Sequence, residues 1–231
     1  MTINVTLITP TCDRPAGIAL MEQYIAEQTI QPDQWIVADG GQSPATLTQG
    51  QEHLHNPGPS GARNLAGNIL AALEAARGSV VIIIEDDDYY APGHIAGCLR
   101  RLGNAAAAGS STLRYYNVAH RCHITMANRG AALCQTALRR VAVPALAQAA
   151  QDCYNVNSYG IDGAFWRRHP GLIHHDNTVV GIKGLPGQGG LGIGHRPQGS
   201  RRPWKNDPSL AVLREWIADA ADNYASMRAA Q

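Results

Sequence analysis

The sequence of 231 residues predicts an α/β fold: a mixed, mostly parallel sheet flanked by helices, with an antiparallel extension in the C-terminal half. Strand and helix patterns alternate over about the first hundred residues, which is typical of a parallel sheet with right-handed crossovers. Within them, Val80–Ile84 is an unbroken run of β-branched apolar residues, as expected of a strand buried on both faces. After Gly103 the predicted strands are shorter and partly polar, which indicates the antiparallel part.

The elements of the first half follow from apolar spacing and from the Pro and Gly residues that end them. Pro10 ends the first strand, and Gly78 is the expected C-cap of a long alanine-rich helix that begins within Gly58–Asn64. In chain order we expect strand Ile3–Thr9, helix Ala16–Gln28, strand Trp35–Ala38, the alanine-rich helix to Arg77, strand Val80–Ile84 and helix Pro92–Leu102.

The second half mixes shorter strands, helices and one long loop. We expect strands Leu113–Val118, His123–Ala127 and Ala131–Leu138, helices Pro144–Gln151 and Tyr159–Arg168, and a glycine-rich loop over 181–199. A last helix is expected from Asn206–Pro208, because a capping residue there precedes a proline. No repeat or linker is visible, so we expect one domain over residues 1–231.

Composition places the chain among ordinary globular proteins. Apolar residues make up 45% and charged residues 16%, which argues against disorder, and a net charge of +1 gives no overall field for nucleic acid or membranes. No apolar run approaches the roughly 20 residues that span a bilayer, and Met1–Ile8 is expected to be a first strand rather than a signal peptide. The five cysteines are widely spaced, so we expect reduced thiols and a cytoplasmic protein.

The predicted buried strand runs directly into four consecutive acids, Glu85–Asp88, which we call the acid cluster. Carboxylates this close repel one another, so a positive partner is expected among them, and the ordinary one is a divalent cation held by oxygen ligands. In open α/β sheets such sites lie at the carboxyl ends of the strands, where this cluster falls. The alternative is a solvated acidic turn without a ligand.

Four segments taken together resemble the family 2-like glycosyltransferases of the GT-A fold. They follow the first strand, end the second strand, open the alanine-rich helix and contain the acid cluster: Thr9–Pro15, Ala38–Gly41, Gly58–Asn64 and Ile84–Pro92. Each segment alone is a weak signal, whereas their order and spacing match over about the first hundred residues. The resemblance implies a nucleotide-sugar-binding half over 1–103 and an acceptor-binding half over 104–231.

The resemblance also implies a divalent metal, Mn²⁺ or Mg²⁺, that binds the diphosphate of the donor. Asp87 corresponds to the usual metal ligand, Asp88 is a second ligand, and the late His195 is the expected third. A shift of one residue, which makes Asp86 and Asp88 the pair, stays open. Glu85 stands where the family has an aspartate, so its expected contact with the ribose departs from the family pattern.

The implied donor is a nucleotide diphosphate sugar, with a UDP-sugar favoured. Its expected contacts come from the resembling segments and the glycine-rich loop: Thr9, Pro10, Asp13, Arg14, Asp39, Arg63, Glu85, Asp86 and Lys183. Arg63 is a candidate because a guanidinium matches phosphate geometry, and the alternative is a surface arginine near a helix start. For Asp39 the alternative is a turn aspartate before two glycines. The glycines of the loop would let its backbone approach the donor and close over it.

Transfer with inversion needs a general base that takes the proton of the acceptor hydroxyl. The segment Tyr159–Arg168 resembles the family's acidic motif at a helix start, which makes Asp162 the expected base, with helix capping as the alternative role and Asp152 as the reserve candidate. The expected acceptor contacts are aromatic and basic residues of the C-terminal half: Trp166, Arg196, Arg201, Arg202 and Trp204. The acceptor is a carbohydrate, a small molecule or modified DNA, the last as a hydroxymethylated base flipped from its stack.

Two other functions stay open. A nucleotidyltransferase shares an α/β nucleotide site and acidic metal ligands, but it usually carries a glycine-rich basic signature after the first strand, and Pro10–Pro15 contains no glycine. The second is a non-catalytic module that binds a nucleotide sugar or a carbohydrate, against which Asp162 and the closing loop argue.

Overall fold

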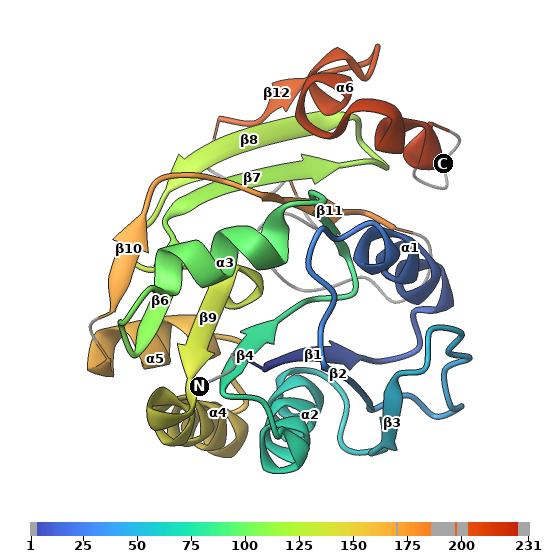
Figure 1. The fold of residues 1–231 in the computed structure, drawn as a ribbon. Helices are drawn as coiled ribbons and strands as arrows, with labels where there is room; N and C mark the ends of the chain where they lie inside the picture. Colours follow the sequence, from blue (N-terminus) through green and yellow to red (C-terminus); the bar gives the residue numbers. More distant parts are fainter. Residues whose placement is uncertain (1–3, 170, 186–196, 198–202, 226–231) are drawn as a thin grey trace.

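The computed structural model describes residues 4–169, 171–185, 197 and 203–225, whose strands form two sheets (Figure 1). The central sheet contains β1 (Val5–Thr11), β2 (Gln34–Asp39), β3 (Glu52–His55), β4 (Val80–Ile83), β6 (Ala107–Ser110), β9 (Thr136–Arg139) and β10 (Leu172–His174). Its strand order is β10-β6-β9-β4-β1-β2-β3. Only β9 runs antiparallel to its neighbours, so the predicted mixed, mostly parallel sheet is confirmed.

Helices cover both faces of the central sheet. They are α1 (Pro15–Ala26), α2 (Ala62–Ala75), α3 (His94–Leu102), α4 (Val143–Val156) and α5 (Ile161–Arg168). α1 and α3 pack with Leu7 and Ile82, whereas α2, α4 and α5 pack with Ile8 and Ile83 on the opposite face. Because successive strand residues point to opposite faces, the continuous apolar runs of β1 and β4 supply both cores.

The second sheet provides the predicted antiparallel extension. It contains β5 (Asp88–Tyr90), β7 (Thr112–Asn117), β8 (Cys122–Ala127), β11 (Val179–Lys183) and β12 (Lys205–Asn206) in the order β12-β8-β7-β11-β5. β7 and β11 pair in parallel, and the other pairs are antiparallel. Figure 1 shows α6 (Ala211–Ile217) at the outer end of this sheet, next to β12. Short 3-10 helices are formed by Leu133–Gln135, Arg140–Ala142 and Ala218–Tyr224.

Two predicted boundaries in the first half were wrong. β1 continues past Pro10, which lies opposite a residue of β2 in the parallel register. α2 ends before Gly78, and its C-cap is Ala76 in an extended conformation. Gly78 is needed for a different reason, since a Cβ atom there would lie 2.7 Å from the backbone nitrogen of Thr6.

The short elements of the chain also differ from the expectation. The strands β3, β6 and β10 were missed because they are brief and partly polar or glycine-containing. Of the predicted strand over 131–138, only its last part is a strand, β9, and Gly181–Lys183 ends β11 instead of opening a loop. The last helix, α6, begins later than expected, after Leu210 with φ of 62°. Asp207 still caps it, because its carboxylate accepts the Ala211 and Val212 N–H groups at 2.9 and 3.0 Å.

Within the described ranges, none of the helices combines the length and the apolar character needed to cross a lipid bilayer. All five cysteines lie in these ranges, and each is a free thiol.

Candidate active site

The carboxyl ends of β1, β2 and β4 lie side by side at one edge of the central sheet, because these strands pair in parallel. The acid cluster follows β4 at this edge and leads at once into β5 of the second sheet. Tyr90 closes the connection, since its hydroxyl accepts the Glu85 N–H at 2.7 Å. The acids therefore lie at the strand edge that the sequence predicts, where the chain passes from one sheet to the other.

Asp86 of the acid cluster contacts the last residue of β1 and the residue that precedes α1. Its carboxylate accepts the Thr11 hydroxyl at 2.6 Å and the Arg14 guanidinium at 2.8 Å, and only 4% of the residue is exposed. Burial raises the pKa of Asp86, while Arg14 and Thr11 favour its charged form. Arg14 also lies 3.6 Å from Asp87. One arginine thus faces two of the four acids.

Lys183 lies between Asp87 and Asp88. Its Nζ donates to Asp87 Oδ2 and to Asp88 Oδ1, both at 2.9 Å. The pairing of β11 with β5 explains these contacts: Gly181 lies opposite Asp88, and Lys183, two residues later, projects from the same face. Burial by itself would lower the pKa of Lys183, but the surrounding carboxylates, chiefly that of Asp87, raise it well above its usual value. An ammonium therefore already holds the two acids that were predicted as metal ligands.

Asp88 also adjoins Glu85 and Cys134. One potential ligand atom from each of these three residues lies within 4.8 Å of the others. Asp88 Oδ2 is buried and accepts no N–H or O–H donor within the described part of the chain, and the Cys134 thiol is a hydrogen-bond partner of the same carboxylate. Burial raises the pKa of Asp88 to about 6, although Lys183 opposes the shift. Burial and then the neighbouring carboxylates raise the pKa of Glu85 to about 8.

These observations fit a divalent cation. Two cationic side chains, Arg14 and Lys183, form ion pairs with three of the four acids, Asp86, Asp87 and Asp88, so the cluster has an excess of two negative charges when all four acids are ionised. Asp88 contributes a buried carboxylate oxygen without an N–H or O–H donor. Hard oxygen ligands of this kind suit Mg²⁺ and Mn²⁺.

Asp39, at the end of β2, organises the loop that follows it. Its two carboxylate oxygens accept the N–H groups of Gly41 at 2.8 Å and Ala45 at 2.7 Å. Asp13 supports the same loop, because it accepts the Gln42 N–H at 3.1 Å from a backbone with φ of 52°. This geometry matches the turn role that was the alternative for Asp39, and it places Asp13 beside it.

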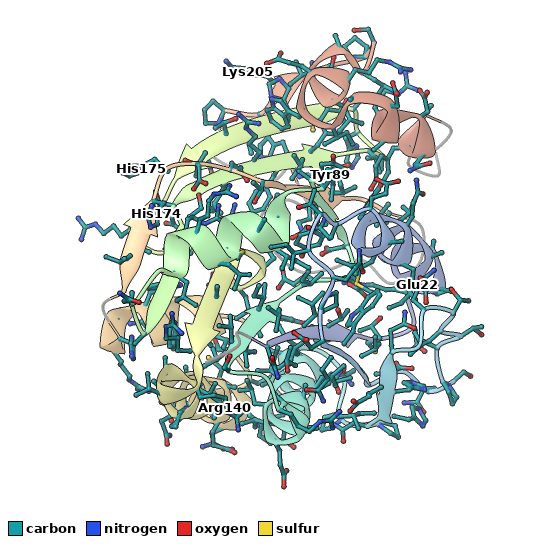
Figure 2. The ribbon with its side chains drawn as sticks, viewed as in Figure 1. Glu22, Tyr89, Arg140, His174, His175 and Lys205 are labelled. Carbon is teal, nitrogen blue, oxygen red and sulfur yellow. The ribbon has the colours of Figure 1, made fainter. Side chains whose placement is uncertain are left out.

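Glu22 on α1 holds the distal part of that loop. Its carboxylate accepts the backbone N–H of Thr48 at 2.6 Å and the Thr48 hydroxyl at 2.8 Å. Glu22 is buried on α1, and Figure 2 shows Tyr89, the residue after Asp88, near the same helix. The loop after β2 is therefore fixed near its start by Asp39 and near its end by Glu22.

Two buried asparagines of α2, which the sequence interpretation did not single out, fix the neighbouring strand ends. Asn64 Nδ2 donates to the carbonyl that follows β2 at 3.0 Å, and Asn68 Nδ2 donates to the last carbonyl of β1 at 3.1 Å. An asparagine pair four residues apart inside a helix was the available signal. Arg63 instead is exposed, and its Nε donates to the Tyr154 carbonyl of α4 at 3.1 Å. This is the surface arginine of the alternative interpretation.

Asp162 lies in the first turn of α5, where its Oδ1 accepts the Gly163 N–H at 2.7 Å. The Asp162 carboxylate repels that of Glu85 electrostatically and so contributes to the raised pKa of Glu85. Burial also raises the pKa of Asp162 itself. The reserve candidate Asp152 instead pairs with Arg168 at the surface between α4 and α5. Asp162 is therefore the better placed of the two candidates.

The remaining predicted contacts lie partly in the core. Thr9 and Pro10 are buried in β1, and the Thr9 hydroxyl accepts the Trp35 N–H at 3.0 Å, so this side chain belongs to the core. The indole nitrogens of Trp166 and Trp204 are buried without a hydrogen bond among the described residues. Four predicted residues lie outside the described ranges, as does the glycine-rich loop from 186 to 196: His195, Arg196, Arg201 and Arg202.

Comparison with known families gives one match over most of the chain. A family profile described as "Glycosyl transferase family 2" matches residues 6–168. This range contains all four segments of the predicted donor half, the acid cluster and α5. No curated protein matches the sequence significantly.

Solved structures resemble the fold at low sequence identity. S. aureus TarS superposes with a TM-score of 0.54 at 10% identity, over 78% of this chain and 37% of TarS. TarS residues 1–349 in complex with UDP give 0.54 at 12% identity, over 78% of this chain and 60% of that one. The chain thus spans only part of these proteins. The 2-C-methyl-D-erythritol 4-phosphate cytidylyltransferase from Thermus thermophilus gives 0.50 at 13% identity, over 77% of this chain and 90% of that one.

Proposed function

The chain belongs to glycosyl transferase family 2, and from this premise we propose that it transfers a sugar from a nucleotide diphosphate sugar, a UDP-sugar by preference, to an acceptor hydroxyl. The observation that carries the proposal is the acid cluster at the carboxyl edge of β4, paired with Arg14 and Lys183 and adjoined by the ends of β1 and β2. In open α/β sheets, this edge is where nucleotides bind.

We assign the donor diphosphate to the cationic side of the cluster. Arg14 and Lys183 each have a hydrogen bond to an acid and lie at the same edge, so their charges favour an incoming diphosphate. Glu85 is assigned to the ribose, and Asp13 and Asp39 to the support of the loop beside the base, since their carboxylates hold its backbone. Thr9 and Arg63 are left out of the donor site for the reasons given above.

A divalent cation, Mn²⁺ or Mg²⁺, is proposed at the acid cluster. Asp88 is its central ligand because one of its oxygens is buried without an N–H or O–H donor, with Asp87 beside it and His195 as a further predicted ligand. When bound, such a cation neutralises the charge that develops on the leaving diphosphate.

Asp162 is proposed as the general base of an inverting transfer. The bond from the sugar to the diphosphate breaks as the acceptor oxygen bonds to the sugar, and the acceptor's proton passes to the Asp162 carboxylate. A pKa raised by burial makes this carboxylate a stronger base than an exposed aspartate. Its position at the start of α5 puts it within electrostatic reach of Glu85 at the donor site.

For the acceptor we keep the three classes that the sequence suggested: a carbohydrate, a small molecule or modified DNA. The proposed contacts are Trp166 and Trp204 together with the basic residues Arg196, Arg201 and Arg202. A screen of nucleotide sugars by thermal shift with Mn²⁺, followed by mass spectrometry of acceptors from each class, tests the proposal. Release of UDP with a hexose-sized mass gain on the acceptor supports it, and a protein that no nucleotide sugar stabilises argues against it.

A nucleotidyltransferase is the second candidate, because the fold also resembles a cytidylyltransferase. Such an enzyme usually carries a glycine-rich basic signature directly after the first strand, and here the turn after β1 supplies a single basic residue, Arg14, and no glycine. The two reactions release different products. Incubation with nucleoside triphosphates gives pyrophosphate only if the chain is a nucleotidyltransferase, whereas a binding module consumes neither kind of donor.

A further inference from the structure

Cys134 reaches the acid cluster through the pairing of β9 with β4. These strands are antiparallel, with Ile82 opposite Ala137. Continuing this register past the end of β4 puts Cys134 opposite Glu85, because each step forward on one strand is a step back on the other. Leu133–Gln135 forms a 3-10 turn there, and Cys134 is buried with 4% of its surface exposed. The thiol thus adjoins the acids by topology, although 46 residues separate it from Asp88 in the sequence.

The two carboxylate oxygens of Asp88 have different surroundings. Oδ1 accepts the Lys183 ammonium at 2.9 Å, whereas Oδ2 is buried and accepts no N–H or O–H donor within the described ranges. The Cys134 thiol is a hydrogen-bond partner of this carboxylate. A thiol is a weak hydrogen-bond donor, so this buried oxygen is poorly satisfied and a cation is a better partner for it. Lys183 already donates hydrogen bonds to Asp87 and Asp88. The other potential metal ligands near Asp88 are the Glu85 carboxylate and the Cys134 thiol.

The three ligand atoms are close enough for one ion to join them. They lie within 4.8 Å of one another, and a metal with bonds of about 2.0–2.3 Å to oxygen and sulfur needs only a modest contraction of that distance. Two of them are carboxylate oxygens and the third is a thiol sulfur. Such a set differs from an all-oxygen site because sulfur favours the softer divalent ions over Mg²⁺.

We propose that Glu85, Asp88 and Cys134 form the divalent-metal site of this protein, with the Cys134 sulfur as a direct ligand and Lys183 remaining on the other oxygen of Asp88. In this arrangement Glu85 binds the metal instead of the ribose, and Asp87 stays paired with Arg14 and Lys183. The inference rests on the proposed function and deepens it, because it names the ligands and the metal preference of that site. Binding replaces the thiol proton with a metal–sulfur bond, and the proton leaves to the solvent. The site therefore prefers Mn²⁺, Co²⁺ or Zn²⁺ to Mg²⁺.

Cobalt provides a direct test, because a thiolate bound to Co²⁺ gives a charge-transfer band in the near ultraviolet that oxygen ligands do not give. We would titrate Co²⁺ into the whole protein and into two single variants, Cys134→Ser and Cys12→Ser. Cys12 is the matched control, since it is the most exposed of the five thiols. We expect the band in the wild-type protein and in Cys12→Ser, and its loss in Cys134→Ser together with a loss of at least about tenfold in Co²⁺ affinity.

Three results would overturn the inference: Co²⁺ binding without the band, a band that persists in Cys134→Ser, or no Co²⁺ binding at all. Should Cys134→Ser not fold, cadmium NMR of Cys12→Ser decides, because a bound sulfur moves the cadmium resonance far downfield of an all-oxygen site. Nucleotide binding separates this inference from the proposed function. UDP binding that needs Mn²⁺, in a protein without the charge-transfer band, refutes Cys134 as a ligand and leaves the glycosyltransferase proposal standing.

Discussion

The contact of Lys183 with Asp87 and Asp88 predicts a large effect of Lys183→Met on stability. The substitution keeps the length of the side chain and removes the ammonium, so two buried carboxylates lose their shared hydrogen-bond donor. Removing one partner of a buried ion pair costs about 3–5 kcal/mol. For a chain of this size, each kcal/mol lowers the melting temperature by about 2–4 °C, so we expect a fall of roughly 6–20 °C in the metal-free protein.

The assay is thermal unfolding in EDTA, followed by circular dichroism, with Lys205→Met as the matched control. Lys205 is the only other lysine in the sequence, and it lies on β12 at the outer end of the second sheet (Figure 2). It is exposed and has no carboxylate partner among the described residues, so its substitution should change stability by less than about 0.5 kcal/mol.

Two further measurements, the pH dependence and the cation dependence of stability, identify why Lys183→Met is less stable. Protonation of the acids removes their repulsion, so the difference between Lys183→Met and wild type should shrink as the pH falls from 8 to 5. A divalent cation should also recover part of the stability, by about 2.7 kcal/mol at a concentration of 100 times its Kd. A Lys183→Met protein that melts with the wild type in EDTA would refute the ion-pair reasoning.

Three other predictions follow from the same geometry. Asp162→Asn should leave UDP binding intact and lower turnover by about 10²–10⁴-fold, with loss of the acidic limb of the pH–rate profile, and wild-type turnover would show that the base lies elsewhere. The pKa of Glu85 is raised from 4.5 to about 8 and that of Asp88 from 3.8 to about 6, so the folded protein binds their protons more tightly than the unfolded chain. In the metal-free protein, the contribution of Glu85 and Asp88 to the free energy of unfolding should therefore be complete below pH 4 and be lost as the pH rises through 6 and 8. Urea titrations that show no such decline would contradict this expectation. Arg14→Gln should weaken UDP binding in calorimetry while Arg63→Ala leaves it unchanged, because Arg63 bonds to α4; equal losses would return Arg63 to the donor site.

Local sequence patterns predicted those parts of the site that lie within one strand or directly after it. The apolar run of β4 and the acids after it follow from adjacent residues, and the parallel order of β1, β2 and β4 follows from strand–helix alternation. Arg63 and Asn64 show the limit of this reasoning. Adjacent helical residues point about 100° apart, so a motif locates the helix start without deciding which side chain faces the strand ends.

The contacts that sequence reasoning missed are those between distant segments. Lys183 lies 95 residues from Asp88, and their contact depends on the antiparallel pairing of β11 with β5, two short strands that were not predicted from the sequence. Cys134 reaches Glu85 through the register of β9, whose boundary was predicted several residues too early. Strand register over such separations is set by tertiary packing, which a single sequence does not reveal.

Calorimetric titration of UDP into the protein, once with Mn²⁺ and once with EDTA, tests most directly the claim that the acid cluster is the metal end of a nucleotide-sugar site. We expect saturable UDP binding with Mn²⁺, and binding weakened by an order of magnitude or more in EDTA and in Asp88→Asn. Equal UDP affinity in EDTA, or no UDP binding in either buffer, would contradict it.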